Sequence, residues 1–290
     1  VLAVEVSTSG MGGDSRIVID GSKLHLMPLR VVPLCIAAVK WPMLMTKLGR
    51  LCEAPAQRQR EAFDMRNVIL EYEFFTASKT AAEGSFSECD ARFLKLVREA
   101  PHSLSEAGAV LGVHPLSFNV AKMEEHGLIQ RIGLTPTDIL HAEGTYTEYC
   151  DKVSRLAVCY ASSRVGMTEC AFIDAVKRAV VDKLTDCVIR KLVGDEAGMT
   201  GGGAAFEDTL SKFITGASGR DYGCRFTANK PIVGIGAPAD AWLPQVAERL
   251  GTDYVSPADH DVGNAVGAIT GCVAETLDIL IEPKGAFKGD

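Results

Sequence analysis

The feature that most constrains the fold is an alternation of strand, glycine turn and helix between residues 231 and 255. The run 231–236, Pro-Ile-Val-Gly-Ile-Gly, predicts a strand that enters a glycine turn. Residues 239–250 predict a helix, and residues 253–255 predict a second short strand. Strands that alternate with helices are typical of a sheet covered by helices. The sequence therefore predicts an α/β protein.

Other segments add elements to this layer. A hairpin is predicted around Gly21-Ser22, and Pro28 and Pro33 mark the start of helical material that runs to Leu51. The remaining predicted strands are 1–6, 16–20, 23–26, 68–75 and 277–281. The remaining predicted helices are 147–163, 168–193, 208–214 and 259–276.

Residues 85–133 follow a different pattern, with three short helices and then a strand at 128–132. Two serines each precede an acidic residue by three positions, the spacing of a capping box, at Ser87/Asp90 and Ser103/Glu106. The third helix is predicted to open at Pro115. This order resembles a helix-turn-helix with the start of a wing. The sequence thus predicts a winged-helix-like module at 85–133, inserted into an α/β domain made of 1–84 and 134–290.

Charge and composition restrict the partners. The net charge of −7 and the acidic pI disfavour a protein that binds nucleic acid through its phosphates, and the inserted module is itself slightly acidic. No apolar run approaches the ~20 residues of a membrane helix, so no membrane partner is expected. Nine cysteines without a CxxC pair predict free thiols in a reducing cytoplasm, and not a zinc ribbon or thioredoxin-like site.

The turn at Gly234, Gly236 and Ala237 is the first candidate site. Glycine lets a backbone approach a ligand closely, and the N-terminus of the following helix offers free N–H groups, which suits a phosphate or nucleotide. By its letters the turn also fits a dinucleotide fingerprint, with Asp253 as the ribose acid 17 residues after Gly236. A tight turn without a ligand is the third interpretation.

The loop Gly12-Gly13-Asp14-Ser15 is the second candidate site. Two glycines, a carboxylate and a hydroxyl in one turn could hold a metal-bound phosphate or a polar substrate. A hairpin-like loop with an Asx turn is the alternative.

Three weaker signals remain. Asp259 is expected to cap a helix, and His260 beside it could act as an acid or base, although no partner can be assigned from sequence. The triple glycine 201–203 is more typical of a flexible linker than of an anion site. The scattered histidines, among them His141, are expected to be surface or capping residues.

Three segments together resemble the hydantoinase/oxoprolinase family. They occur in the family's order at 4–17, at 133–141 (Gly-Leu-Thr-Pro-Thr-Asp-Ile-Leu-His) and at 231–239 continued by 263–269. The resemblance implies an actin-like (ribonuclease H-like) ATPase fold. It also implies an enzyme that uses ATP and Mg²⁺ to activate a cyclic amide or related carbonyl substrate by phosphorylation, for ring opening or carboxylation. Hydantoins, 5-oxoproline and ketones all remain open as the small-molecule substrate.

The resemblance also assigns the candidate residues. The turn at Gly234, Gly236 and Ala237 would lie against the adenosine. Gly12 and Gly13 would face the phosphates, with Asp14 and Ser15 as catalytic residues and Asp14 as the metal ligand.

One departure from the family has consequences for partners. The family carries two D-x-G-G-T-type phosphate loops before the segment that opens this chain, and neither is present. The chain is therefore expected to be the C-terminal part of the enzyme, completed by an N-terminal remainder or a second subunit, and inactive alone. Two alternatives are a nucleotide-sensing regulatory protein with the inserted module as its output, and a nicotinamide-dinucleotide-binding protein.

Overall fold

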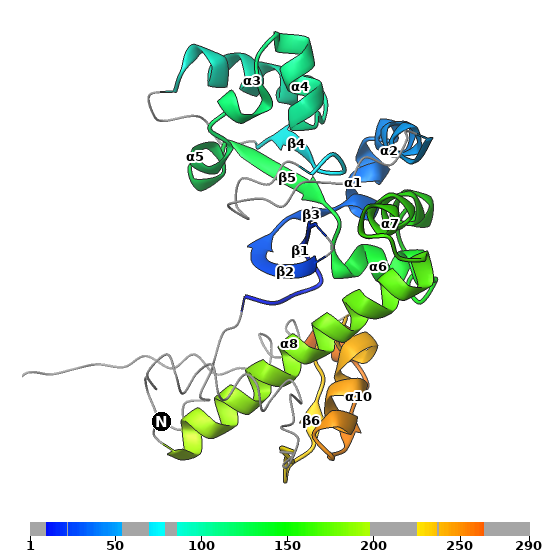
Figure 1. Ribbon diagram of the computed structural model, residues 1–290. Coiled ribbons are helices and arrows are strands. Elements are labelled where there is room, and N and C mark those ends of the chain that lie inside the picture. Colours follow the sequence, from blue (N-terminus) through cyan, green and yellow to red (C-terminus); the bar gives the residue numbers. More distant parts are fainter. Residues whose placement is uncertain are drawn as a thin grey trace, which may run out of the picture.

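The computed structural model describes residues 10–21, 23–53, 70–78, 86–197, 225–236 and 238–263. Helices and small sheets share this part of the chain, so the protein is mixed α/β, as the sequence predicts (Figure 1). Several predicted elements lie outside the described residues: the strands 1–6 and 277–281, the helix 208–214, and most of the helix 259–276.

In the described ranges the strands form three small sheets. Their bounds are β1 Ser15–Asp20 with β2 Lys23–Arg30; β3 Val32–Pro33, β5 Ile129–Gly133 and β4 Phe74–Ala77 in that spatial order; and β6 Ile232–Val233 with β7 Tyr254–Val255. The helices are α1 Leu34–Lys40, α2 Met43–Glu53, α3 Glu88–Glu99, α4 Leu104–Leu111, α5 Val120–Glu125, α6 Pro136–Glu143, α7 Asp151–Val165, α8 Glu169–Ala197 and α10 Ala239–Arg249. Two 3₁₀ turns, η1 Pro115–Ser117 and η2 His260–Val262, complete the set.

The predicted hairpin is confirmed, but its second strand is longer than expected. Gly21 turns the chain with a φ of 58°, which an L side chain rarely adopts. β2 then continues to Arg30 and includes Pro28, which the sequence suggested as the start of helical material. Proline is tolerated there because β2 is an edge strand of a two-stranded sheet and needs no second row of hydrogen bonds. The helices begin only after Pro33, at Leu34.

β5, which the sequence predicts as the first strand of a wing, lies instead in a three-stranded sheet. β5 is the central strand of its sheet, parallel to β3 and antiparallel to β4, and most of its residues are buried. β4 itself begins at Phe74, later than predicted, because residues 70–73 form a turn closed by the Glu73 amide on the Leu70 carbonyl at 3.0 Å. The last strand of the module, β5, thus pairs with two strands from outside residues 85–133, β3 and β4.

The helices of the module are largely as predicted. Both capping boxes are present, Ser87 with Asp90 and Ser103 with Glu106. The third helix is wrong in its extent, because it divides into η1 and α5. Between the two, Phe118 is extended and stacks on a ring of α3, and the Asp90 carboxylate accepts the Asn119 amide at 2.9 Å. That long-range hydrogen bond holds the chain out of helical conformation.

The described residues contain two larger hydrophobic cores and a smaller third cluster. The module's core is built on Phe75, Phe93 and Met123. The larger core lies below it in Figure 1, between β1 and the helices α1, α2, α6, α7 and α8. Trp242 of α10 reaches the larger core, and α10 also packs along α8 through a smaller cluster that includes Val246. α8 therefore provides the surface against which α10 packs.

A buried ion network joins the module to the larger core. The Glu73 carboxylate accepts from Arg16 of β1 at 2.5 and 2.8 Å and from Arg131 of β5 at 2.7 Å. Arg131 in turn donates to Glu124 of α5 at 2.9 and 3.0 Å. Arg16 and Glu73 are 1% and 2% exposed. Water therefore does not solvate either charge, and their ion pair offsets the cost of burying them.

Within the described ranges, no helix combines the length and the apolar character needed to cross a bilayer. The seven cysteines in those ranges form no disulfide bond; they are at positions 35, 52, 89, 150, 159, 170 and 187.

Candidate functional site

The loop before β1 is a tight, internally bonded turn. The Gly12 amide donates to Ser15 Oγ at 2.9 Å, and the Ser15 amide donates to the Gly12 carbonyl at 3.1 Å. The Asp14 carbonyl accepts from Val31 at the end of the hairpin. Ser15 is 2% exposed. Its hydroxyl oxygen therefore closes the loop by accepting the Gly12 amide.

Gly13 lies against the first turn of α6. Its carbonyl accepts two hydrogen bonds from Thr137, from the amide at 3.0 Å and from Oγ1 at 2.8 Å. A Cβ at position 13 would lie 2.7 Å from Thr137 Oγ1, closer than real side chains approach. Four residues further on, the Ile17 amide donates to the Leu134 carbonyl at 3.0 Å. The loop and the 134–138 segment are thus one structural unit.

Asp14 is the charged group that this unit presents to solvent. Its carboxylate is 3.8 Å from the Arg30 guanidinium, and the two side chains are 37% and 74% exposed. Such a pair is held weakly and can be opened by a ligand. Mg²⁺ in nucleotide sites commonly takes one or two carboxylates and completes its shell with phosphates and water. Asp14 fits that role, although the part of the chain that the structure describes has no cluster of three or more His, Cys, Asp or Glu able to hold a metal.

Asp138 stabilises the 134–138 segment, which contacts the loop at Gly12–Ser15. Thr135 caps α6, Pro136 occupies its first position, and Asp138 closes the capping box. The same carboxylate reaches a second helix: it accepts the amides of Leu34 and Cys35 at the start of α1, at 3.2 and 2.7 Å. Ser154 of α7 donates to it as well, at 3.0 Å. Complete burial raises the pKa of Asp138, and these hydrogen bonds oppose that rise.

His141, at the other end of α6, is buried and not a surface residue. The Tyr149 amide donates to its Nε2 at 3.2 Å, so Nε2 carries the lone pair. Nδ1 must then hold the proton, which it donates to the Thr137 carbonyl at 2.9 Å. His141 is therefore a structural residue that connects the loop after α6 to the helix.

The second glycine turn uses its amides internally. The Gly234 amide donates to Val255 of β7 at 3.0 Å, and the Gly236 amide donates to the His260 carbonyl at 2.6 Å. Gly236 has a φ of 109°, which requires glycine, and a Cβ on Gly234 would collide with the ring of Tyr254. Ala237 lies outside the described residues. These two amides are thus not free to bind a phosphate.

A polar cluster that the sequence did not reveal surrounds this turn. Asp240, in the first turn of α10, accepts a hydrogen bond from Tyr254 Oη and pairs with His260 Nε2 at 2.9 Å. Hydrogen bonds from Tyr254 and Ser256, and then the charge of His260, lower the pKa of Asp240. The sequence assigns no partner to His260, and in the structure Asp240 pairs with it. Asp259 stands at the N-cap position of η2 but makes no capping hydrogen bond, so the predicted cap is wrong.

The two ends of helix α6 have different neighbours. Its first turn contacts Gly13 through Thr137. Just beyond its last turn, Tyr146 bonds back to the Leu140 carbonyl, and the charge of Asp240 contributes, after burial, to raising the pKa of Tyr146.

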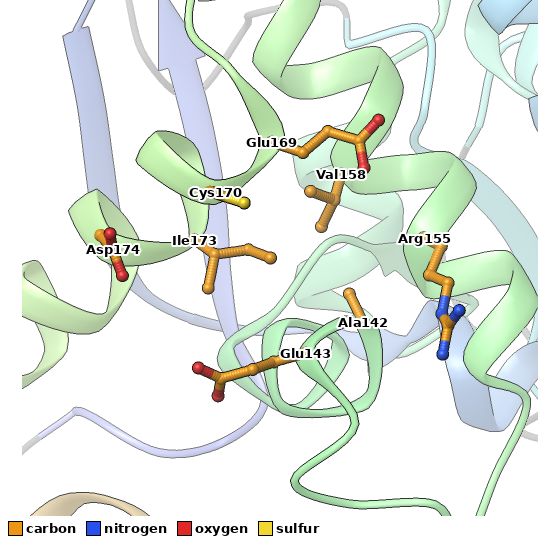
Figure 2. A pocket seen from close by; sticks show the side chains of 8 residues that line it. All are labelled: Ala142, Glu143, Arg155, Val158, Glu169, Cys170, Ile173 and Asp174. Carbon is orange, nitrogen blue, oxygen red and sulfur yellow. The ribbon is translucent and has the colours of Figure 1, made fainter.

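A pocket of about 410 Å³ lies where α6, α7 and α8 meet (Figure 2). Its lining residues are Ala142, Glu143, Arg155, Val158, Glu169, Cys170, Ile173 and Asp174. Figure 2 shows Ala142, Cys170 and Ile173 around its centre, whereas the charged ends of Arg155 and Asp174 point away from it. No residue of either glycine turn lines this pocket. The triple glycine 201–203 lies outside the described residues.

No known family model matches this chain, and neither a curated protein nor a solved structure does. The residues and their geometry therefore carry the functional argument.

Gly13→Ala is expected to lower the free energy of unfolding by about 1 to 3 kcal/mol, because the new methyl group forces Gly13 and Thr137 apart. Urea unfolding followed by circular dichroism measures this loss. Gly49→Ala is the matched control: nothing lies within 4 Å of a Cβ at this helical position, so alanine should stabilise α2 by about 0.5 to 1 kcal/mol. Adding Thr137→Ala should recover part of the Gly13→Ala loss; equal losses with and without it would mean that the contact is not tight.

Proposed function

We propose that this chain is the C-terminal part of an ATP-dependent enzyme of the hydantoinase/oxoprolinase type, which activates a cyclic amide or related carbonyl compound. One observation supports the proposal above others. Two of the three segments that resemble the family, although more than a hundred residues apart, form one unit through the paired hydrogen bonds of Thr137 to the Gly13 carbonyl. That unit ends in a solvent-exposed carboxylate, Asp14.

In this proposal the loop holds the charged end of the nucleotide. When bound, ATP with Mg²⁺ supplies the phosphoryl group that makes the substrate carbonyl reactive. Asp14 is the metal ligand, and Arg30, 3.8 Å from it, provides positive charge for the phosphates. Gly12 and Gly13 keep side chains out of the way, and Ser15 holds the turn closed. The D-x-G-G-T loops of the family would supply the remaining phosphate contacts.

In the proposal, the turn at Gly234 and Gly236 binds the adenosine part of the nucleotide. Because both amides already donate within the protein, an adenosine there would be held by packing against the glycine backbone and by neighbouring polar side chains. Tyr254 and His260, both tied to Asp240, lie at this turn and offer such groups. Ala237 belongs to the same proposed contact.

Asp14→Asn is the direct test of the nucleotide site. Once this chain is combined with a polypeptide that carries the D-x-G-G-T loops, ATP turnover should fall by about a hundredfold, because the amide is a poor Mg²⁺ ligand and stabilises developing charge less well. The unfolding midpoint should not change, since Asp14 is exposed. Turnover is measured as phosphate release with hydantoin, 5-oxoproline and a simple ketone in parallel.

Asp151→Asn is the matched control, because it removes the same charge from an exposed pair, with Arg155, on α7. Its turnover should equal that of the unchanged protein. Equal turnover in Asp14→Asn would remove the loop from the active site. Turnover with none of the substrates, together with binding of duplex DNA at physiological salt, would favour a regulatory protein instead; preference for NAD over ATP would favour a dinucleotide site.

A further inference from the structure

The pocket where α6, α7 and α8 meet has an apolar centre. Its volume of about 410 Å³ is in the range of small-molecule sites. Figure 2 shows four small or apolar groups around its open space, those of Ala142, Val158, Cys170 and Ile173. A thiol packs much as a small apolar group does. A ligand with an apolar body would therefore bury apolar surface at this centre, which favours its binding.

The rim of the pocket is charged, and two of its charges already have partners. Glu143 pairs with Lys177 at 2.7 Å and also accepts the Thr145 hydroxyl at 2.9 Å. Arg155 pairs with Asp151 at 3.2 Å. Each of these ion pairs carries no net charge, so neither gives the pocket a preference for a cation or an anion.

Two rim carboxylates remain, those of Glu169 and Asp174. Neither forms an ion pair within the ranges that the structure describes. Glu169 is the first residue of α8, and Figure 2 shows its carboxylate beside Val158, whereas Asp174 points away from the centre. The positive end of the α8 dipole opposes them with about half a unit charge. The groups that line the pocket therefore leave it with a surplus of negative charge.

A metal ion is a poor match for this surplus. The described part of the chain contains no group of three or more His, Cys, Asp or Glu side chains that could hold a metal. The carboxylates of the pocket thus stand apart around an apolar centre. An organic cation matches both features, since its charge and its apolar body occupy different places.

We propose that this pocket binds a small organic cation, an ammonium group attached to an apolar body. The body fills the centre, and the ammonium group lies at the Glu169 carboxylate. At ~30 Å³ for each water molecule, the pocket has the volume of roughly 14 waters, which limits the ligand to about as many non-hydrogen atoms. This inference is independent of the proposed ATP-dependent activity, because the pocket is lined by none of the residues assigned to the nucleotide.

The test compares three probes of nearly equal size: the cation 2-phenylethylammonium, the neutral 2-phenylethanol and the anion 3-phenylpropionate. Isothermal titration calorimetry with the full chain at neutral pH measures their affinities. The ammonium ion should bind with a Kd of about 1 mM, about fivefold tighter than the alcohol, because it gains one exposed ion pair. The anion should bind more weakly than the alcohol. Equal affinities of the ammonium ion and the alcohol, or no binding of the ammonium ion, would overturn the proposal.

Two cysteines in equivalent positions locate the bound probe. Cys170 and Cys89 are each the second residue of a helix and follow a glutamate, but Cys89 does not line the pocket. At about ten times its Kd, 2-phenylethylammonium leaves only about one pocket in ten empty. Alkylation of Cys170 by N-ethylmaleimide, followed by peptide mass spectrometry, should then slow about tenfold, and alkylation of Cys89 should not change. If the probe slowed both cysteines equally, or neither, it would not be bound in this pocket.

Variants of the rim and of the centre separate the two parts of the proposal. Glu169→Gln should weaken binding of 2-phenylethylammonium about fivefold and leave binding of 2-phenylethanol unchanged. Glu88→Gln is the matched control, because Glu88 is likewise the exposed first residue of a helix, and it should change neither affinity. Ala142→Leu fills part of the centre and should weaken both probes, with circular dichroism to confirm the fold. An ammonium affinity that Glu169→Gln leaves unchanged would contradict the proposed role of the charge.

Discussion

Asp138→Asn is expected to lower the free energy of unfolding by about 3 to 5 kcal/mol. The carboxylate accepts from five donors: the amides of Leu34, Cys35 and Thr135, and the hydroxyls of Thr135 and Ser154. In asparagine one of the two oxygens becomes an NH₂ group, which can only donate. At least two buried donors would then face another donor, and each costs about 1 to 3 kcal/mol.

Urea unfolding at 25 °C, followed by circular dichroism, measures this loss. Asp90→Asn is the matched control, because Asp90 closes the capping box of α3 but accepts only one further amide, that of Asn119. Its loss should be about 1 to 2 kcal/mol, the size of a lost cap and one further hydrogen bond. A loss in Asp138→Asn no larger than in Asp90→Asn would mean that its contact with α1 contributes little.

Glu73→Gln should destabilise the protein by a similar amount, about 3 to 5 kcal/mol. Glu73 is the single carboxylate between the guanidinium groups of Arg16 and Arg131, and all three side chains are buried. The amide removes the negative charge but leaves two positive charges close together in a place that water does not reach. Repulsion and desolvation then both act against folding.

The same urea experiment with Glu143→Gln controls for the chemistry of the substitution. Glu143 pairs with Lys177 at 2.7 Å near the surface, where water screens the charges. Its replacement should change the free energy of unfolding by less than about 1 kcal/mol. If both glutamine variants lost the same amount, the buried network would be no stronger than a surface ion pair. Because this network reaches from β1 to α5, its loss should also loosen the module, visible as faster hydrogen exchange in β5.

Much of the local structure follows from short-range signals. The capping boxes at Ser87 and Ser103 each begin the helix that the spacing predicts, and the hairpin turns at Gly21. These features depend on residues a few positions apart, so a single sequence contains all the information they need. The third helix of the module is the exception: Asp90, 29 residues away, holds the Asn119 amide and interrupts it.

The candidate site was only partly visible in the sequence. The loop at Gly12–Ser15 and the turn at Gly234–Gly236 were singled out by their glycines, and both are tight turns. Asp240 was not singled out, because an acidic residue in the first turn of a helix is a common feature. Its role beside Tyr254 and His260 arises from the pairing of β6 with β7, which brings residues 14 and 20 positions away to the same helix end.

What the sequence by itself determined is therefore the class of the fold, its capped helices and its hairpin, since each depends on neighbours in the chain. Only the tertiary structure decided that Asp138 caps two helices, that one glutamate holds two buried arginines, and that the predicted wing strand is the centre of a sheet. Those outcomes depend on which distant surfaces exclude water together. Burial makes a charge or an amide dependent on one particular partner, and no local pattern of residues specifies which partner it will meet.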